Sequence, residues 1–211
     1  MTETAPDATL IAGVRPDACL AYANTLFWRG RETPTETVPD FATLFGWIAG
    51  SSGYGKEAIQ PLGTAIGSPG AQSALFGDAI DIREAIYKIF SALASGHAVA
   101  EADLATLNAA LARAPERGQI ARLGEGFAWQ TEARWLEPAH LSAPALLAPV
   151  LWSAADLMTQ RARHRIRQCA NETCRWLFLD ESKNGTRRWC DMTSCGNRAK
   201  ARRHYLKRKT V

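Results

Sequence analysis

The apolar side chains of this 211-residue chain recur mainly with the period of an α-helix. The longest pattern runs from about residue 71 to residue 95, and Gly96 follows it in a position suited to a left-handed helix end. Side chains spaced three and four residues apart lie on one face of a helix, which a globular fold buries. The face predicted here consists of Leu75, Ala79, Ile82, Ile86, Ile89 and Leu93.

Shorter periodic segments flank this helix. Further helices are predicted over about residues 16–28, 40–50, 101–114, 143–163 and 197–209. Residues 119–135 differ, because their apolar positions lie on both sides of Gly124-Glu125-Gly126, a pattern typical of a β-hairpin. The sequence therefore predicts a mainly α N-terminal domain with a small β-hairpin.

Four cysteines near the C-terminus form two pairs with the same spacing. Each pair reads C-x4-C, and fifteen residues lie between the pairs. Four thiolates match the tetrahedral preference of a structural Zn²⁺ ion, and a complete protein shell leaves no position for a substrate. We therefore expect one structural zinc ion, bound by Cys169, Cys174, Cys190 and Cys195.

Two alternatives compete with zinc: a pair of disulfides, or buried thiols that merely cluster. Disulfides need an oxidising compartment, but residues 1–7 are acidic and lack the basic start and apolar core of a signal peptide. No apolar run is long enough to span a bilayer, so we expect a cytoplasmic protein without membrane association. His164 and His204 could substitute as ligands, although four cysteines already complete the shell.

The segments around the cysteines predict the form of the metal module. Residues 176–179 have strand character, Asn184-Gly185 suits a tight turn, and residues 187–189 would return as a second strand. Each C-x4-C pair, residues 169–174 and 190–195, is expected to fold as a zinc knuckle. The order knuckle, hairpin, knuckle and helix is a treble-clef-like arrangement. The expected fold class is therefore α+β: the mainly α domain followed by a C-terminal four-cysteine zinc finger. Such a module has too little apolar surface to fold without its metal.

Charge is divided along the chain in the same way. Residues 161–211 hold 15 Lys/Arg and 4 Asp/Glu, whereas residues 1–160 hold 10 Lys/Arg and 17 Asp/Glu. A basic, metal-stabilised module is typical of a nucleic-acid binder, and a merely solvated basic tail is the alternative. Trp176 and Trp189 are expected to form the small core of this module rather than to stack on bases. The side chains predicted to contact nucleic acid are Arg187, Arg188, Arg198, Lys200, Arg202, Arg203 and Lys207.

Two motifs resemble known families. The stretch Cys195-Gly196-Asn197-Arg198, with matching residues over about 165–207, resembles the CGNR zinc-finger family. Upstream, Ala21-Tyr22-Ala23-Asn24-Thr25-Leu26 is similar to the opening motif of the ABATE domain, which usually precedes this finger. The resemblance implies a bacterial protein that is proposed to regulate transcription, including under stress.

The N-terminal domain carries no nucleophile elbow, P-loop or His-Glu-x-x-His motif, so we expect no enzyme, and the alternative is an enzyme that uses a pocket of this domain. Four of its side chains, Asn24, Arg83, Tyr87 and Trp129, are candidates for an effector pocket. Each is equally compatible with a packed or hydrogen-bonded structural role.

Together these patterns predict two domains. Residues 1–160 would form an ABATE-like domain that senses a small-molecule effector or forms a homodimer, and residues 161–211 would form the zinc finger. The predicted function is a DNA-binding transcriptional regulator that contacts double-stranded DNA. The alternatives are a zinc-stabilised protein-interaction module and an RNA binder.

Overall fold

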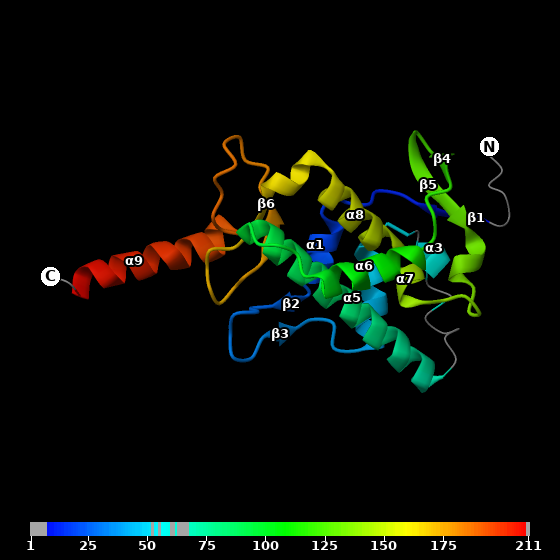
Figure 1. Ribbon diagram of the computed structural model, residues 1–211, viewed down its shortest axis with the longest axis horizontal. Coiled ribbons are helices and arrows are strands. Elements are labelled where there is room, and N and C mark those ends of the chain that lie inside the picture. Colours follow the sequence, from blue (N-terminus) through cyan, green and yellow to red (C-terminus); the bar gives the residue numbers. More distant parts are fainter. Residues whose placement is uncertain (1–7, 52, 55, 60–61, 63–67, 210–211) are drawn as a thin grey trace.

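The structure is a computed structural model that describes residues 8–51, 53–54, 56–59, 62 and 68–209. At positions 56, 57, 203, 204, 206, 207 and 209 it describes the backbone only. Helices form most of the body, small antiparallel sheets lie at its edges, and the C-terminal helix extends away from it (Figure 1). The predicted α+β fold class is confirmed. Within the described part of the chain, no helix has the length and apolar character that a membrane span requires.

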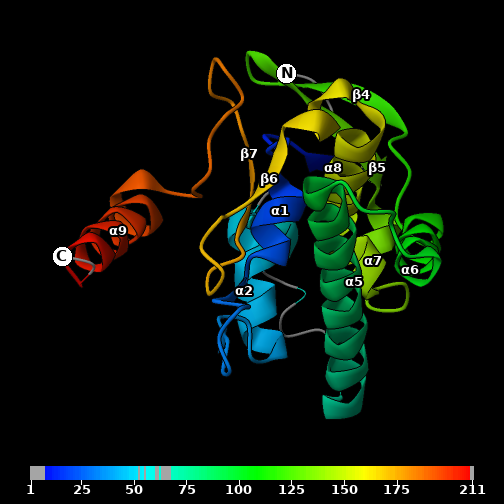
Figure 2. The same ribbon diagram turned by 60° about the vertical axis from the view of Figure 1, so that its left-hand side comes forward.

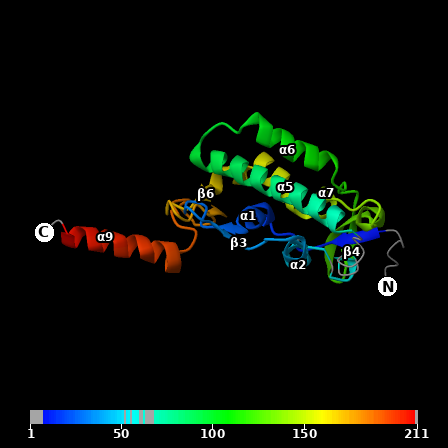
Figure 3. The same cartoon turned by 90° about the horizontal axis from the view of Figure 1, so that it is seen from below.

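The body is built around one long helix, α5 (Pro69–Ser95). Ser68 caps its start by accepting a hydrogen bond from the Ala71 N–H at 3.2 Å, and Gly96 ends it with a φ of 70°. Helix α6 (Glu101–Ala112) runs beside α5, as Figures 1 and 3 both show. The other helices of the body are α1 (Ala18–Ala23), α2 (Phe41–Ser51), α3 (Lys56–Ile59), α6 (Glu101–Ala112), α7 (Ala143–Leu146) and α8 (Ala148–Thr159).

Two predicted helices are shorter than their sequence patterns. Residues 16–28 form α1 only as far as Ala23, after which the chain turns into a short strand. Residues 143–163 divide into α7, α8 and a 3-10 helix over Arg161–Arg165. A proline inside a helix removes an N–H donor and clashes with the preceding turn. The break therefore lies just before Pro149, which occupies the first turn of α8.

The predicted hairpin over 119–135 is confirmed and belongs to a larger sheet. Strands β4 (Gln119–Leu123) and β5 (Gly126–Glu132) pair antiparallel, with Leu123 opposite Gly126. Gly124, in the turn, has a φ of 57°, a conformation that glycine adopts without steric cost. Strand β1 (Ala8–Ile11) adds to the other side of β5, so the strand order is β1-β5-β4. A 3-10 helix over Ala133–Leu136 follows β5.

The finger begins with strand β6 (Ile166–Gln168), and its pairing corrects the sequence prediction. Strand β7 (Leu177–Leu179) pairs antiparallel with β6 and not with residues 187–189, which form no strand. The reason is burial: Ile166 and Leu177 are each 1% exposed and belong to the same apolar core as α1, α5 and α8. The sheet therefore fastens the finger to the body.

Side-chain and isolated backbone hydrogen bonds hold the returning segment instead of a strand ladder. The Asp180 carboxylate accepts from the Arg187 N–H at 2.9 Å, and the Ala170 N–H donates to the Arg188 carbonyl oxygen at 2.9 Å. The chain then enters the π-helical turn η3 (Met192–Gly196) and the predicted helix α9 (Asn197–Lys209). In Figure 2, α9 stands apart from α1, α2 and α5.

Candidate metal centre and basic helix

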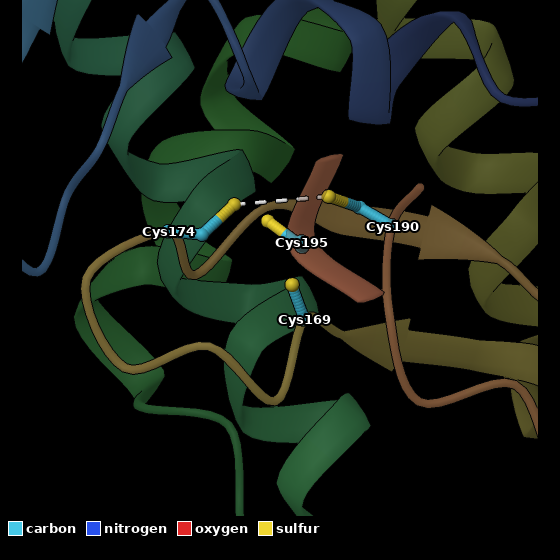
Figure 4. Close-up of side chains that lie close together, drawn as sticks. All are labelled: Cys169, Cys174, Cys190 and Cys195. Atoms are coloured by element: carbon cyan, nitrogen blue, oxygen red, sulfur yellow. Dashed lines mark hydrogen bonds between the residues drawn. The ribbon is translucent and has the colours of Figure 1, made fainter. Parts of the chain in front are cut away.

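Four separate segments bring the paired cysteines to one point. Cys169 follows β6, Cys174 precedes β7, Cys190 ends the returning segment, and Cys195 lies in η3. All four sulfurs lie within 4.8 Å of one another (Figure 4), and the Sγ atoms of Cys174 and Cys190 are 3.7 Å apart. Zinc–sulfur bonds of about 2.3 Å in a tetrahedron place neighbouring sulfurs about 3.8 Å apart. The spacing therefore fits zinc, and it is far beyond the roughly 2.05 Å of a disulfide.

Local hydrogen bonds shape the first knuckle. The Asn171 carbonyl oxygen accepts from the Cys174 N–H at 2.8 Å and from the Arg175 N–H at 3.1 Å. The Asn171 side-chain oxygen accepts from the Thr173 N–H at 3.1 Å. Its Nδ2 lies 3.6 Å from Cys195 Sγ, so it can donate to a thiolate of the other knuckle.

The second knuckle is arranged around Asp191. One carboxylate oxygen accepts from the Ser194 N–H and from the Thr193 hydroxyl, each at 2.7 Å. These hydrogen bonds lower the pKa of Asp191, so the carboxylate stays ionised and keeps η3 in shape. Cys195 is thereby held toward the other three sulfurs at the start of α9.

The thiols strongly affect one another's ionisation. Hydrogen bonds from the Cys174 and Cys190 thiols lower the pKa of Cys169 to about 2, and the hydrogen bond to Cys169 raises the pKa of Cys174 to about 12. The same interactions raise the pKa of Cys190. One proton therefore leaves easily and the others resist, because each new thiolate faces an existing one. A divalent cation removes this opposition by neutralising the thiolates, so zinc binding should release protons.

Cys19, the fifth cysteine, plays no part in this cluster. Its side chain is fully buried in the body, and burial raises the pKa of its thiol to about 12. Its backbone N–H donates to the Ser153 hydroxyl at 3.1 Å. Cys19 is therefore a small, buried side chain of the core.

Three tryptophans pack against the cysteines. Trp176 and Trp189 do so from the finger, in agreement with the sequence prediction. Trp28 does so from the body, a contact that the sequence did not predict. Its only signal in the sequence is its place a few residues after the Asn24-Thr25 motif, which by itself indicates no contact with the cysteines.

The basic residues predicted to bind nucleic acid occupy different environments. Arg187 serves the finger's own structure: its guanidinium lies over the Phe178 ring at 4.7 Å and donates to the carbonyl oxygens of Trp189 and Cys190. Arg188 is exposed, with its guanidinium 5.4 Å from the centre of the Trp189 ring.

On α9, the side chains of Arg198, Lys200 and Arg202 are exposed. The side chains of Arg203 and Lys207 lie outside the described part of the chain, although α9 includes both positions. His204, one of the two histidines considered as substitute ligands, is described by its backbone only.

The four candidates for an effector pocket lie in different surroundings. Asn24 binds the Leu177 backbone through both atoms of its amide, at 2.7 and 2.9 Å. Arg83 is 2% exposed and forms ion pairs with Glu36 and Glu84.

The Tyr87 hydroxyl donates to the Arg175 carbonyl oxygen at 3.2 Å. Asn24 and Tyr87 therefore contact the finger directly, whereas Arg83 binds two glutamates of the body. Trp129 instead lines a cavity of about 260 Å³ with Arg117 and Trp152. An effector pocket stays a prediction.

Comparisons with known families agree with the geometry. The model of the ABATE family, described as "Putative stress-induced transcription regulator", matches residues 17–161. The model of the CGNR zinc finger matches residues 165–208. A search among curated proteins gave no match. Neither family is of an enzyme type. The chain therefore belongs to the ABATE family and is a zinc-binding regulator whose C-terminal CGNR finger is organised around one structural Zn²⁺ ion.

Proposed function

We propose that this regulator binds double-stranded DNA through its zinc finger and that α9 makes the principal contact. In this proposal Cys169, Cys174, Cys190 and Cys195 are the zinc ligands and hold the start of α9 in place. The observation that carries it is the character of α9: the helix contains seven Lys/Arg and no acidic residue, and it extends away from the body (Figure 2).

The shape and charge of α9 suit a DNA groove. A single α-helix fits the major groove, which is about 12 Å wide. Arg198 and Arg202 are four residues apart, so they lie on one face of the helix, and both are exposed. Contacts from such side chains to phosphates release counterions, which makes binding weaken steeply as salt rises. Arg188 adds an exposed charge on the finger, four residues before η3.

The test is a titration of the zinc-loaded protein with mixed-sequence duplex DNA at several salt concentrations. Arg202→Ala should weaken binding and reduce the slope of log affinity against log salt by about 1, because one phosphate contact is lost. Arg113→Ala is the matched control, since Arg113 is an exposed arginine of the body. Removal of zinc with a chelator should abolish binding.

The alternatives give different results in the same titration. No binding at low salt would contradict the proposal and favour a protein-interaction module. Preference for single-stranded or structured RNA over duplex DNA would indicate an RNA binder. The division into residues 1–160 and 161–211, effector sensing, homodimer formation and a cytoplasmic location stay predictions.

A further inference from the structure

A small hairpin of the ABATE domain lies against the first cysteine knuckle. It consists of β2 (Leu26–Phe27), β3 (Thr35–Glu36) and the loop between them, and we call residues 26–36 the bracket hairpin. Figure 1 shows its strands below α1 and next to the loops of the finger. The sequence patterns that predicted the paired cysteines and the basic helix did not predict this contact.

The backbones meet so closely at Gly30 that a side chain does not fit. The Gly30 N–H donates to the Thr173 carbonyl oxygen at 3.3 Å. A Cβ atom at Gly30 would overlap with the Glu172 carbonyl oxygen and lie 2.9 Å from the Thr173 Cα. Backbone atoms cannot move aside as a flexible side chain can, so this contact requires glycine.

Trp28 brings an aromatic wall to the cysteines. Its φ of 57° is unusual for a bulky residue, and such conformations persist only where the surrounding structure imposes them. The indole packs against the cluster of Cys169, Cys174 and Cys195. With Phe27 and Trp176, Trp28 also lines a cavity of about 310 Å³ that reaches Cys174, Cys190 and Cys195. Without the bracket hairpin, this cavity would lose two of the three aromatic side chains that line it, Phe27 and Trp28.

Trp28 also contacts the basic helix. The Arg198 guanidinium lies 4.6 Å from the centre of the Trp28 ring, a cation–π geometry. Arg198 belongs to the first turn of α9. One residue of the ABATE domain therefore touches both the cysteine cluster and the helix that leaves it.

Ion pairs fix the bracket hairpin to α5. Arg29 binds the Glu84 carboxylate at 2.7 and 3.0 Å, and its guanidinium lies 3.7 Å from the centre of the Tyr87 ring. At the other end, Glu36 of β3 accepts from both terminal nitrogens of Arg83, at 2.8 and 2.7 Å. The hairpin is thus held to the longest helix on one side and to the metal module on the other.

We propose that Gly30 and Trp28 are positioning residues of the zinc centre. The ABATE domain supplies, through the bracket hairpin, a wall that shields the zinc thiolates and orients the first turn of α9. Zinc leaves more slowly from the full chain as a result, because water and competing ligands reach the sulfurs less easily. The proposal rests on the zinc centre and is independent of DNA binding.

The test is the rate of zinc transfer from the full-length protein to an excess of 4-(2-pyridylazo)resorcinol, followed by absorbance. Gly30→Ala should release zinc about tenfold faster, the lower end of the range for lost supporting contacts of a metal ligand. Gly46→Ala is the control, because a Cβ at Gly46 meets no atom within 4 Å. Equal rates for Gly30→Ala and the unmodified protein would overturn the proposal.

A second variant separates shielding from loss of fold. Trp28→Ala should also release zinc about tenfold faster while far-UV circular dichroism of the body is preserved. Its control is Trp135→Ala, since Trp135 is half-buried in the 3-10 helix that follows β5, and this variant should release zinc at the unmodified rate. A Trp28→Ala protein that folds and keeps zinc as long as the control would contradict a shielding role.

A third measurement needs no variant. Amide hydrogen exchange of the unmodified protein, with and without chelator, should show that zinc removal deprotects residues 26–36 as well as the finger. Unchanged protection of the bracket hairpin after zinc removal would overturn the proposal, whatever the two variants do.

Discussion

The side chain of Asn24 joins the ABATE domain to the finger. Its amide binds both polar atoms of the Leu177 backbone, across 153 positions of sequence, and its side chain takes the place of a neighbouring strand. Asn24 is 3% exposed and Leu177 is 1% exposed, so neither backbone atom has water as an alternative partner. The sequence analysis selected Asn24 as a candidate for binding an effector and did not predict its contact with the Leu177 backbone.

Glu84 offers a prediction at the residue scale because two arginines, Arg29 and Arg83, bind it. Burial opposes ionisation of its carboxyl group, but the hydrogen bonds and charges of both arginines outweigh burial and hold its pKa below the ordinary 4.5. Ionised Glu84 therefore stabilises the fold above pH 4.5, and this contribution is lost as pH falls through the lowered pKa.

The variant Glu84→Gln should be less stable than the unmodified protein at pH 7, and the difference should shrink below pH 4.5. Urea unfolding of both proteins at each pH measures it. The comparison is made at equal pH because acid also protonates the zinc thiolates in both proteins. Glu125→Gln, in the exposed turn of the β4–β5 hairpin, is the control. A difference that stays constant from pH 7 to pH 3 would show that this ion-pair network does not stabilise the fold in the way described.

At the scale of elements, helix α5 and the β4–β5 hairpin followed their sequence patterns, whereas the strand pairing in the finger did not. The pattern over 71–95 predicted α5 within two residues at its start, because helix bonds and capping act between near neighbours. Strand β7 has its partner on the other side of the first knuckle, and its apolar residues alone do not specify which segment it joins. Burial of Ile166 and Leu177 in the body decided between the two possible partners.

Two glycines of the α5 region give opposite predictions. Gly77 lies inside the helix, and a Cβ added there would meet no atom within 4 Å, so Gly77→Ala should stabilise the protein by about 0.5–1 kcal/mol. Gly96 ends the helix with a φ of 70°, so Gly96→Ala should destabilise it by about 1–2 kcal/mol. Chemical denaturation of the zinc-loaded proteins measures both changes. Shifts of the same sign would contradict the assigned helix end.

At the scale of the whole molecule, the finger and the ABATE domain share one apolar core. Ile166 and Leu177 come from the finger and pack among residues of α1, α5 and α8. The basic helix α9 lies at the far end from the sheet of β1, β5 and β4 (Figure 3). The body therefore supports the metal centre from one side, while α9 extends from the other.

The shared core predicts that damage in the finger reaches the helices of the body. Leu177→Ala should lower the free energy of unfolding by about 2–5 kcal/mol, because it removes a fully buried side chain. Unfolding followed by far-UV circular dichroism should show the lower stability as a single transition, shifted for the whole chain. Leu123→Ala, at a position 46% exposed, is the control. Two separate transitions, with the helical one unshifted, would show that the finger unfolds independently.

The sequence by itself determined the features that depend on residue type and on near neighbours. These are the apolar period of α5, the left-handed end at Gly96, the four cysteines with zinc-binding chemistry, and the basic character of α9. Only the tertiary structure decided the pairing of β6 with β7, the clamp of Asn24 on Leu177, and the contact of Trp28 and Gly30 with the knuckle. The physical reason is that these contacts join segments brought together by burial of a common core, and no local pattern records which buried surfaces meet.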